Sequence, residues 1–249
     1  MISACIVTFN SLEDIKAALD SIAKTQAAVF VVDNQSTDGT PEWVKQNYPQ
    51  ITLIQSAENK GFGAGNNQVL KLLNSKYHVM MNPDVTIEAD LLERMAAFMD
   101  AHPEVVLLSP RVVYPDGTEQ FLPKKRPSLH YLAAGMLEKY GPPFTDWRKK
   151  YTGQDAVSSE PREVDFATGC FMFVRTDAFK KIGGFDESFF MYMEDADLTL
   201  RMKKEGKVLY HPDFVVTHAW KRESHSNPKL KKMHMDSIKR FFKKWGLRM

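Results

Sequence analysis

Cysteines are scarce in this sequence, and long apolar runs are missing. The only two cysteines, Cys5 and Cys170, each lie in an apolar stretch, which excludes a disulfide framework or a zinc ribbon and favours a reducing compartment. No apolar run approaches the roughly 18 residues that a membrane-spanning helix needs. Residues 1–9 lack the basic start and the cleavage site of a signal peptide. These absences predict a cytoplasmic protein.

The composition is that of a folded protein. The chain has 249 residues, of which 43% are hydrophobic and 26% charged, and it contains no internal repeat or low-complexity tract. This length is enough for one large α/β domain with a sizeable core, and the composition excludes a disordered chain.

The small net charge of +2 conceals an asymmetry between the body and the tail. Ten lysines and arginines in residues 221–249 face only Glu223 and Asp236, so this tail carries +8 and residues 1–220 carry −6. A basic tail on an acidic body predicts contact between the tail and something anionic.

In the first hundred residues, short apolar runs alternate with stretches of helical periodicity. Strands are expected at 2–9, 28–32, 51–54 and 77–81, and helices at 12–22, from Thr40 onward, from Gly61 to Leu73, and at about 89–101. This alternation predicts βαβ units and a mostly parallel sheet flanked by helices. Ligands bind outside the carboxyl ends of such strands. The polar residues that fall there are Asn10, Asp33, Asn82 and Asp84.

The second half begins with a turn-rich insertion, from about 114 to 162, which contains many prolines and glycines and is expected on the surface. Regular structure resumes with a strand at 166–174, a short helix capped by Thr176, a helix at 194–204, short strands at 208–210 and 214–217, and a helix from Pro228. We therefore expect a body at 1–220, which includes the insertion, followed by a helical tail at 221–249.

Asn82-Pro83-Asp84 directly follows one of the expected strands. A carboxylate in this place can hold Mg²⁺ or Mn²⁺, which take one or two protein carboxylates and complete their shells with phosphate oxygens and water. Asn-Pro and Pro-Asp are also turn dipeptides, and for the tripeptide alone a simple turn is the better interpretation.

Glu194-Asp195-Ala196-Asp197 places three carboxylates at the start of a helix. Acidic residues favour this end of the helix dipole, so capping explains one or two of them. The preceding apolar run at 189–193 would also desolvate a carboxylate and raise its pKa, as a general base requires. From the local sequence both interpretations stand equally.

Two further features are weak when taken singly. His218 follows a short strand; a lone histidine is usually a packed or surface residue, but its imidazole would also complete a metal site with Asp84. The glycine-rich segment 61–65 precedes a helix and suggests close backbone approach to a ligand. It is not the dinucleotide fingerprint, because Asn66 stands where that pattern needs glycine.

Taken together and in order, these segments resemble the inverting glycosyltransferases of family 2, which have the GT-A fold. The resemblance covers roughly residues 1–220. It is carried by Val7–Asn10, Val31–Thr40, Glu58–Asn67, Asn82–Asp84, Ala167–Cys170, Gly183–Asp186, Met193–Leu198 and His218. The Asn-Pro-Asp tripeptide and the Glu-Asp-x-Asp-Leu helix look most like the rhamnosyltransferase branch.

The resemblance implies a role for each matching residue. Thr8, Asn10 and Asp33 would hold the nucleoside, with Asp33 on the base. The rest of the nucleotide-sugar site would comprise Ser36, Asn59, Gly61, Asn66, Asn82 and Gly169, the last beside the donor sugar.

The resemblance also implies a metal site and a base. Asp84 and His218 would bind Mg²⁺ or Mn²⁺ on the donor diphosphate. The first acid of the usual DxD-type motif is replaced here by Asn82, which removes one charge and weakens the case for a strict metal requirement. Asp195 would be the general base and Glu194 would orient the acceptor. Direct attack by the acceptor hydroxyl would invert the anomeric carbon.

We thus expect transfer of a sugar, L-rhamnose from dTDP-L-rhamnose, to a cell-surface polysaccharide or lipid-linked glycan precursor. The alternatives are a UDP-hexose donor or a catalytically silent module that binds sugar nucleotides or glycans. A nucleotidyltransferase is disfavoured because a basic glycine-rich loop does not follow the first strand.

In the tail, five apolar residues recur at helical spacing between lysines: Leu230, Met233, Ile238, Phe241 and Trp245. Packing on the body and binding of an anionic membrane surface account equally well for this pattern. Nucleic acid is not expected, because no binding motif accompanies the charge. The second interpretation would place the protein peripherally on the inner face of the cell membrane.

Overall fold

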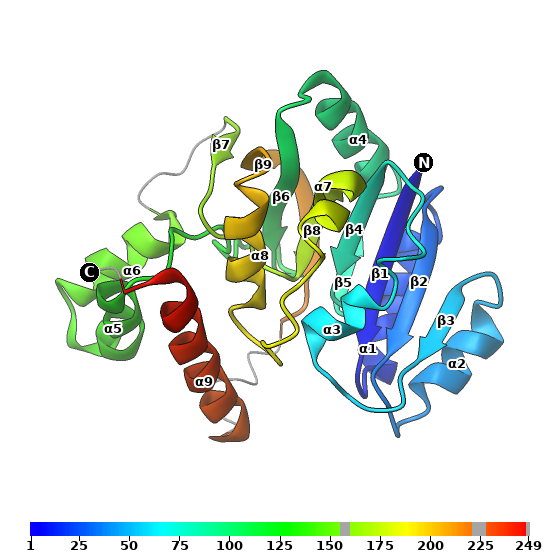
Figure 1. Cartoon of the computed structure of the whole chain (residues 1–249), viewed down its shortest axis with the longest axis horizontal. Coiled ribbons are helices and arrows are strands. Elements are labelled where there is room, and N and C mark those ends of the chain that lie inside the picture. The colour runs from blue at the N-terminus through cyan, green and yellow to red at the C-terminus, as the bar shows by residue number, and fades with distance from the viewer. Residues whose placement is uncertain (155–159, 221–227, 248–249) are drawn as a thin grey trace.

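The computed structural model describes residues 1–154, 160–220 and 228–247. Within them, one mixed sheet has the strand order β3-β2-β1-β4-β8-β6-β9-β5, and β7 pairs with β9 (Figure 1). The strands are β1 (Ile2–Thr8), β2 (Ala28–Asp33), β3 (Thr52–Gln55), β4 (Tyr77–Met81), β5 (Val85–Ile87), β6 (Val105–Val113), β7 (Arg162–Glu163), β8 (Phe171–Arg175) and β9 (Lys207–His218).

The first four strands along the chain form the parallel half of the sheet. Their central members are apolar and buried on both faces, as expected where helices cover both sides of a sheet. Thr8 at the end of β1 pairs with Asp33 at the end of β2, and Ile6 pairs with Met81 at the end of β4. The polar residues that follow these strands therefore share one edge, as the sequence predicts.

Antiparallel pairing brings the second half of the chain to the same edge. β8 runs against β4, so that Phe171 faces Met81, and the backbone N–H of Asn82 donates to the Cys170 carbonyl at 2.9 Å. β5 runs against β9 and pairs Val85 with His218. The start of β8 and the end of β9 thus join the loop that follows β4.

Helices cover both faces of the sheet. One apolar cluster packs the sheet against α1 (Leu12–Ile22), α2 (Thr40–Asn47) and α4 (Leu91–Ala101). The cluster on the other face includes residues of α7 (Thr176–Lys181) and α8 (Glu194–Met202), with α3 (Phe62–Asn67) at its margin. The fold is therefore the α/β, GT-A-like architecture that the sequence predicts, with a mostly parallel sheet between helical layers.

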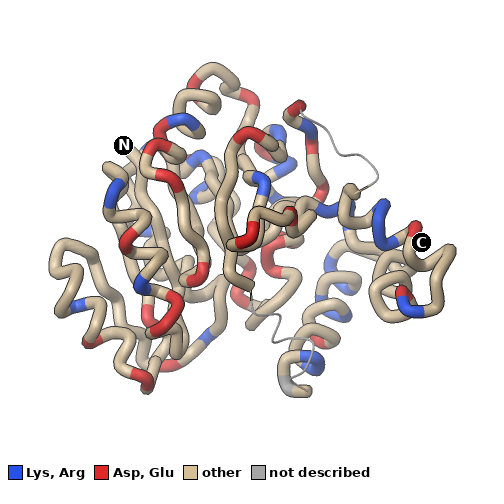
Figure 2. Tube along the Cα trace, turned by 180° about the vertical axis from the view of Figure 1, so that it is seen from behind, with Lys and Arg blue, Asp and Glu red and all other residues tan. Residues whose placement is uncertain are grey.

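The helix expected from Pro228 is present as α9 (Pro228–Trp245). Its residues Ile238, Phe241 and Phe242 are buried against Phe189 and Met193, at the start of α8. Leu230 and Met233 are half-buried. Much of the apolar face of α9 thus packs on the body, while lysines and arginines recur on its other side (Figure 2). The remaining tail residues, 221–227 and 248–249, lie outside the described part, and the division of the chain at residue 220 stays a prediction.

The expected insertion is more regular than its composition suggests. It contains α5 (Leu129–Leu137), a 3-10 turn η1 (Glu138–Tyr140) and α6 (Phe144–Thr152), which we call the α5–α6 lobe. The Ser128 hydroxyl accepts from the Tyr131 N–H and caps α5. Gly141, Pro142 and Pro143 lie between the turn η1 and α6, and Gly135 lies inside α5, so the segment resembled a long loop.

Several other expected boundaries differ. The two short strands expected at 208–210 and 214–217 form one strand, β9, which continues through a register shift opposite Pro110 and Arg111. The strand expected at 166–174 begins only at Phe171, because Phe166 bridges to Lys124 instead. The helix expected from Gly61 to Leu73 ends at Asn67. Strands β5 and β6 were not foreseen.

Candidate active site

The loops after β1 and β2 are tied together by hydrogen bonds between predicted donor-site residues. The Thr8 hydroxyl donates to Asp33 Oδ1 at 3.0 Å, and the Ser36 backbone N–H donates to Asp33 Oδ2 at 2.9 Å. The Asn10 N–H donates to Ser36 Oγ at 2.8 Å, while Asn10 Oδ1 accepts from the Thr37 N–H at 2.8 Å. Thr8 and Asp33 are almost fully buried. Four of the predicted nucleoside residues therefore form one ordered unit.

Gly61 lies where two backbones meet. Its φ is +92°, and a Cβ added there would lie 1.8 Å from the Phe190 carbonyl oxygen. Its N–H donates to Asn59 Oδ1 at 2.9 Å, and its carbonyl accepts from Asn34 Nδ2 at 3.1 Å. The sequence suggests that this glycine lets the backbone approach a ligand, which stays a prediction. In the structure Gly61 lies against the segment before α8, whose Phe190 carbonyl accepts from the Phe62 N–H.

Asn66 is fully buried in α3. Its Nδ2 donates to the Phe62 carbonyl at 3.1 Å, and among the described residues its Oδ1 has no hydrogen-bond partner. An unpaired buried amide oxygen is costly unless a ligand or water satisfies it. Its assignment to the donor site stays a prediction.

The two predicted metal ligands contact one another. His218 Nε2 lies 3.3 Å from Asp84 Oδ1, and both side chains are largely buried. Gln120 holds the other side of the imidazole: its Nε2 donates to the His218 carbonyl at 2.6 Å, and its Oε1 lies 3.0 Å from Nδ1. The Gln120 amide oxygen faces Nδ1 and so favours a proton on that nitrogen, while Nε2 faces Asp84.

This donor pair fits a divalent cation. Burial lowers the pKa of His218, but the Asp84 carboxylate and the neighbouring Cys170 outweigh burial and raise the pKa to about 10. A pKa this high puts a proton on both ring nitrogens, and a cation held by Asp84 and His218 would replace the Nε2 proton. Within the described residues no cluster of three or more His, Cys, Asp or Glu suited to a metal is found. A cation here would depend on diphosphate oxygens and water for the rest of its shell, as Mg²⁺ commonly does.

Asp195 and Glu194 lie in the first turn of α8 and are buried. Asp195 Oδ2 accepts from the Gly169 N–H at 2.9 Å, and Oδ1 accepts from the Ala196 N–H at 2.9 Å. Glu194 Oε2 has no hydrogen-bond partner among the described residues. The preceding residues, Tyr192 and Met193, have φ values of 69° and 66°, a left-handed turn that non-glycine residues rarely adopt.

Burial raises the pKa of Asp195, while the Gly169 N–H and the charge of Lys124 oppose this shift. Burial, and then the charge of Asp195, raise the pKa of Glu194 well above its usual value. Two neighbouring carboxyl groups with raised pKa values are typical of acid–base sites. The prediction that the apolar run at 189–193 desolvates these carboxylates agrees with this environment.

Lys124 was not foreseen as a site residue. Its ammonium lies 5.0 Å from the centre of the Phe166 ring and 5.9 Å from that of Tyr151. Burial lowers its pKa, partly offset by the charge of Asp195. Lys124 and Gln120 both belong to the expected surface insertion, and the buried Leu122 between them was the available sign that this segment returns to the body.

The third carboxylate of the acidic cluster has a different environment. Asp197 is fully buried, and Oδ2 accepts from Arg201 Nε at 2.8 Å. Oδ1 lies 2.7 Å from both Lys244 Nζ and Trp245 Nε1. Asp197 therefore joins α8 to α9 and faces protein cations.

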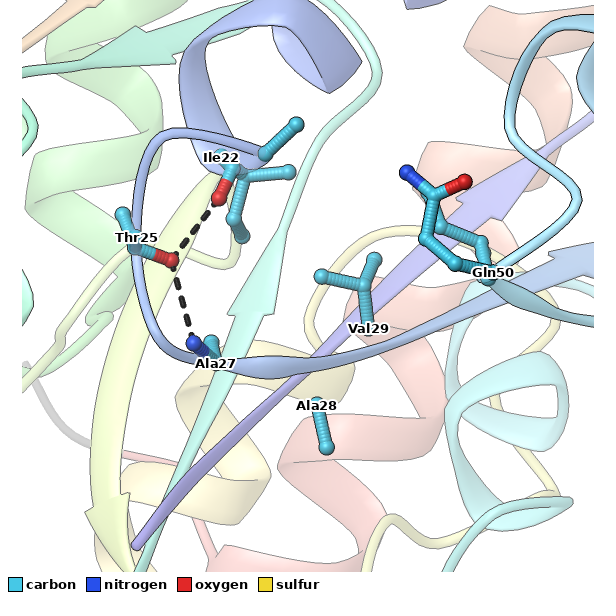
Figure 3. Close-up of a pocket in the computed structure, with 8 residues that line it drawn as sticks. Ile22, Thr25, Ala27, Ala28, Val29 and Gln50 are labelled. Atoms are coloured by element: carbon cyan, nitrogen blue, oxygen red, sulfur yellow. Dashed lines mark hydrogen bonds between the residues drawn. The ribbon is translucent and has the colours of Figure 1, made fainter.

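The predicted site residues form a continuous path along one edge of the sheet. Asp195 accepts a hydrogen bond from the Gly169 N–H, and the carbonyl of the following residue, Cys170, accepts one from the Asn82 N–H. Two residues after Asn82, Asp84 contacts His218. The pocket in Figure 3 lies away from this path, at the opposite ends of the strands, around Thr25, Ala28 and Gln50. Among the described residues that line it, none has an ionisable side chain, so it offers no acid–base or metal chemistry.

Comparison with known proteins gives consistent matches. The family model described as glycosyl transferase family 2 matches residues 3–183. An N-acetylglucosaminyl-diphospho-decaprenol L-rhamnosyltransferase of Mycobacterium tuberculosis is 32% identical over 221 residues, which cover 83% of this chain and 71% of the relative. The rhamnosyltransferase WbbL of Escherichia coli is 26% identical over 231 residues, covering 88% of this chain and 83% of the relative.

Solved structures show the same fold. The mannosyltransferase PcManGT from Pyrobaculum calidifontis, in complex with GDP-Man and Mn²⁺, aligns with a TM-score of 0.66 at 19% identity, over 98% of this chain and 63% of that one. TarS residues 1–349 from S. aureus align with a TM-score of 0.61 at 19% identity, over 95% of this chain and 65% of that one. This chain thus spans less than two thirds of each of these solved chains.

Proposed function

Because this chain belongs to glycosyl transferase family 2, and is therefore a glycosyltransferase, we propose that it transfers L-rhamnose from dTDP-L-rhamnose to a hydroxyl group of a lipid-linked glycan precursor. The observation that carries the proposal is the path from the buried Asp195, through Gly169 and Asn82, to the Asp84–His218 pair. The choice of donor and acceptor is supported by the rhamnosyltransferase relatives, the nearer of which is named for a diphospho-decaprenol acceptor.

Asp195 is the proposed general base. Its carboxylate takes the proton from the acceptor hydroxyl as that oxygen attacks the anomeric carbon. The Gly169 N–H holds Oδ2, which fixes the carboxylate beside the segment expected to contact the donor sugar. A raised pKa improves the base, because a more basic carboxylate draws the proton more strongly.

Glu194 is proposed to orient the acceptor. Its raised pKa favours the protonated form, which can donate one hydrogen bond and accept another. The unpartnered Oε2 is the atom we assign to this contact. The charge of Lys124 lowers the pKa of Asp195 and so favours the ionised form that a base needs.

The nucleoside is assigned to the unit formed by Thr8, Asn10, Asp33 and Ser36, with Asn59, Gly61, Asn66 and Asn82 beside it. Asp84 and His218 would hold Mg²⁺ or Mn²⁺. When bound, such a cation neutralises the charge that develops on the departing nucleoside diphosphate. Because Asn82 replaces an acid, the protein supplies one carboxylate fewer to this task. No covalent glycosyl-enzyme is needed, so the anomeric configuration inverts.

Thermal stability with a panel of nucleotide sugars tests the donor. We expect dTDP-L-rhamnose at about 100 times its Kd to raise the melting temperature by about 5–10 °C, because the ligand binds only the folded state. UDP-sugars and GDP-sugars should shift it less, and Mn²⁺ should enlarge the response. A larger shift with a UDP-hexose would keep the family but overturn the rhamnose assignment. No shift with any donor would favour a silent module that binds glycans.

A variant of Gln120 tests whether Mn²⁺ binds at the proposed metal site. Gln120→Leu removes the acceptor for His218 Nδ1 and should weaken Mn²⁺ binding about 10–100-fold in a calorimetric titration with dTDP present. Gln46→Leu, on the exposed side of α2, is the matched control and should bind Mn²⁺ as the unaltered protein does. Equal affinities in all three proteins would remove His218 from the metal site.

A further inference from the structure

The α5–α6 lobe carries an apolar ridge that no described part of the protein covers. Leu129, Met136 and Tyr140 are 43%, 71% and 66% exposed. They are seven and four residues apart, so they lie on one side of α5 and the turn that extends it. The other side packs on α6, where the Tyr131 and Tyr151 rings stack 5.0 Å apart. Exposed apolar residues gathered on one side of a helix can mark an interaction site.

The lobe that carries this ridge and the helix α9 are both rich in positive charge. Residues 121–154 contain seven lysines and arginines against two acids, and α9 contains seven against one. Lys149 and Lys150 of α6 are exposed and form no ion pair with any described residue. In Figure 2 the basic residues recur along α9 and in the lobe beside it. A partner that binds this surface would therefore be anionic and would also accept apolar side chains.

The lobe is joined to the acceptor side of the proposed active site. Leu132 of α5 packs into the cluster formed by α8 and α9. Arg126, just before α5, donates to the Trp245 carbonyl of α9 at 2.8 Å. Lys124, two residues earlier, is close enough to Asp195 to affect its pKa. A surface that binds the lobe would thus lie near the proposed base.

We propose that the α5–α6 lobe is a membrane-docking element, in which Leu129, Met136 and Tyr140 enter the interface of an anionic bilayer. Lys149, Lys150 and the exposed basic residues of α9 then face the lipid phosphates. This placement differs from the tail prediction, in which the apolar residues of α9 would insert, because Ile238 and Phe241 are buried in the body. Among the described helices none has the length and apolarity to span a membrane, which suits binding at the surface.

Membrane docking would bring the proposed active site to a lipid-linked acceptor in the same bilayer, so the purpose of docking rests on the proposed function. Binding itself needs no sugar nucleotide, so the two can fail separately. The probe is a set of vesicles of phosphatidylcholine alone and of equimolar phosphatidylcholine and phosphatidylglycerol, tested by co-sedimentation with the whole chain.

We expect binding to the anionic vesicles only. Lys149→Glu/Lys150→Glu should weaken it about 30-fold or more, since each basic residue near an anionic surface contributes roughly a fivefold factor. Met136→Ser/Tyr140→Ser should weaken it about tenfold or more, because the apolar contacts are lost. The control, Lys24→Glu/Lys45→Glu, changes charge equally at exposed positions near α1 and on α2 and should bind normally.

Each contrary outcome overturns the proposal. Equal losses in the control and in the lobe charge variant would mean non-specific attraction. Unchanged binding by the ridge variant would exclude insertion of α5. If the unaltered protein binds no vesicles but forms a dimer that the ridge variant abolishes in light scattering, the ridge is a contact between copies of this chain. An unchanged melting temperature without ligand confirms that each variant is folded.

Discussion

Replacing Asp195 with asparagine is expected to lower kcat by about 10²–10⁴-fold while leaving donor binding nearly intact. Asparagine has the same shape, and its amide oxygen can still accept from the Gly169 N–H, so the loop before β8 keeps its place. The amide cannot take a proton from the acceptor hydroxyl. Steady-state transfer kinetics and thermal stabilisation by the donor, measured on the same preparation, separate the two effects.

The pH profile gives the same residue a second test. Asp195 must be ionised to act as the base, so kcat should fall as the pH is lowered. Because burial raises the pKa of Asp195, this fall should begin at a higher pH than it would for an ordinary aspartate base. Asp195→Asn should lose this limb of the profile. Asp177→Asn, on the exposed side of α7, is the matched control and should keep both rate and profile. Loss of donor binding in proportion to kcat would refute the assignment of Asp195 as base.

Asp197→Ala should lower the free energy of unfolding by about 3–5 kcal/mol, the usual range for breaking a buried ion pair from one side. The carboxylate is fully buried and contacts Arg201, Lys244 and Trp245 within 2.8 Å. Its removal leaves the Arg201 guanidinium, only 15% exposed, without its carboxylate. Urea unfolding followed by tryptophan fluorescence measures the change.

The control for Asp197 lies on α9 itself. Asp236 pairs with Lys239 at 3.7 Å, but both side chains are more than half exposed. Asp236→Ala should therefore change the free energy of unfolding by less than about 1 kcal/mol. If Asp197→Ala were equally mild, the pairing of Lys244 with Asp186, also at 2.7 Å, would suffice to hold α9, and our description of Asp197 as the joint between the two helices would be wrong.

The parallel half of the sheet was predictable from the sequence because each strand is a short apolar run that ends in a polar residue. Parallel strands place their carboxyl ends together, so this rule alone assigns Asp33 and Asp84 to one edge. His218 and Asp195 could not be placed by that rule. Their position depends on the antiparallel pairing of β5 with β9 and on the bond from Gly169 to α8, which join residues more than 25 positions apart.

Gln120 and Lys124 escaped prediction for a related reason. Each acts through a contact with a remote segment, at His218 and near Asp195, and the local sequence, apart from Phe121 and Leu122, contains mostly turn and charged residues. In α9 the helix itself was predictable, but its partner was not, because periodicity shows an apolar face without showing what covers it. Phe189 and Met193, which cover it, lie about fifty residues earlier.

The anomeric configuration of the product tests the central claim most directly. The claim is that a single displacement, with Asp195 as base, transfers rhamnose from dTDP-L-rhamnose to a lipid-linked acceptor. The protein should be incubated with that donor and a diphospholipid-linked N-acetylglucosamine, and the product examined by NMR. We expect a rhamnoside whose anomeric configuration is opposite to that of the donor. A product with retained configuration would require a second displacement and would contradict the account.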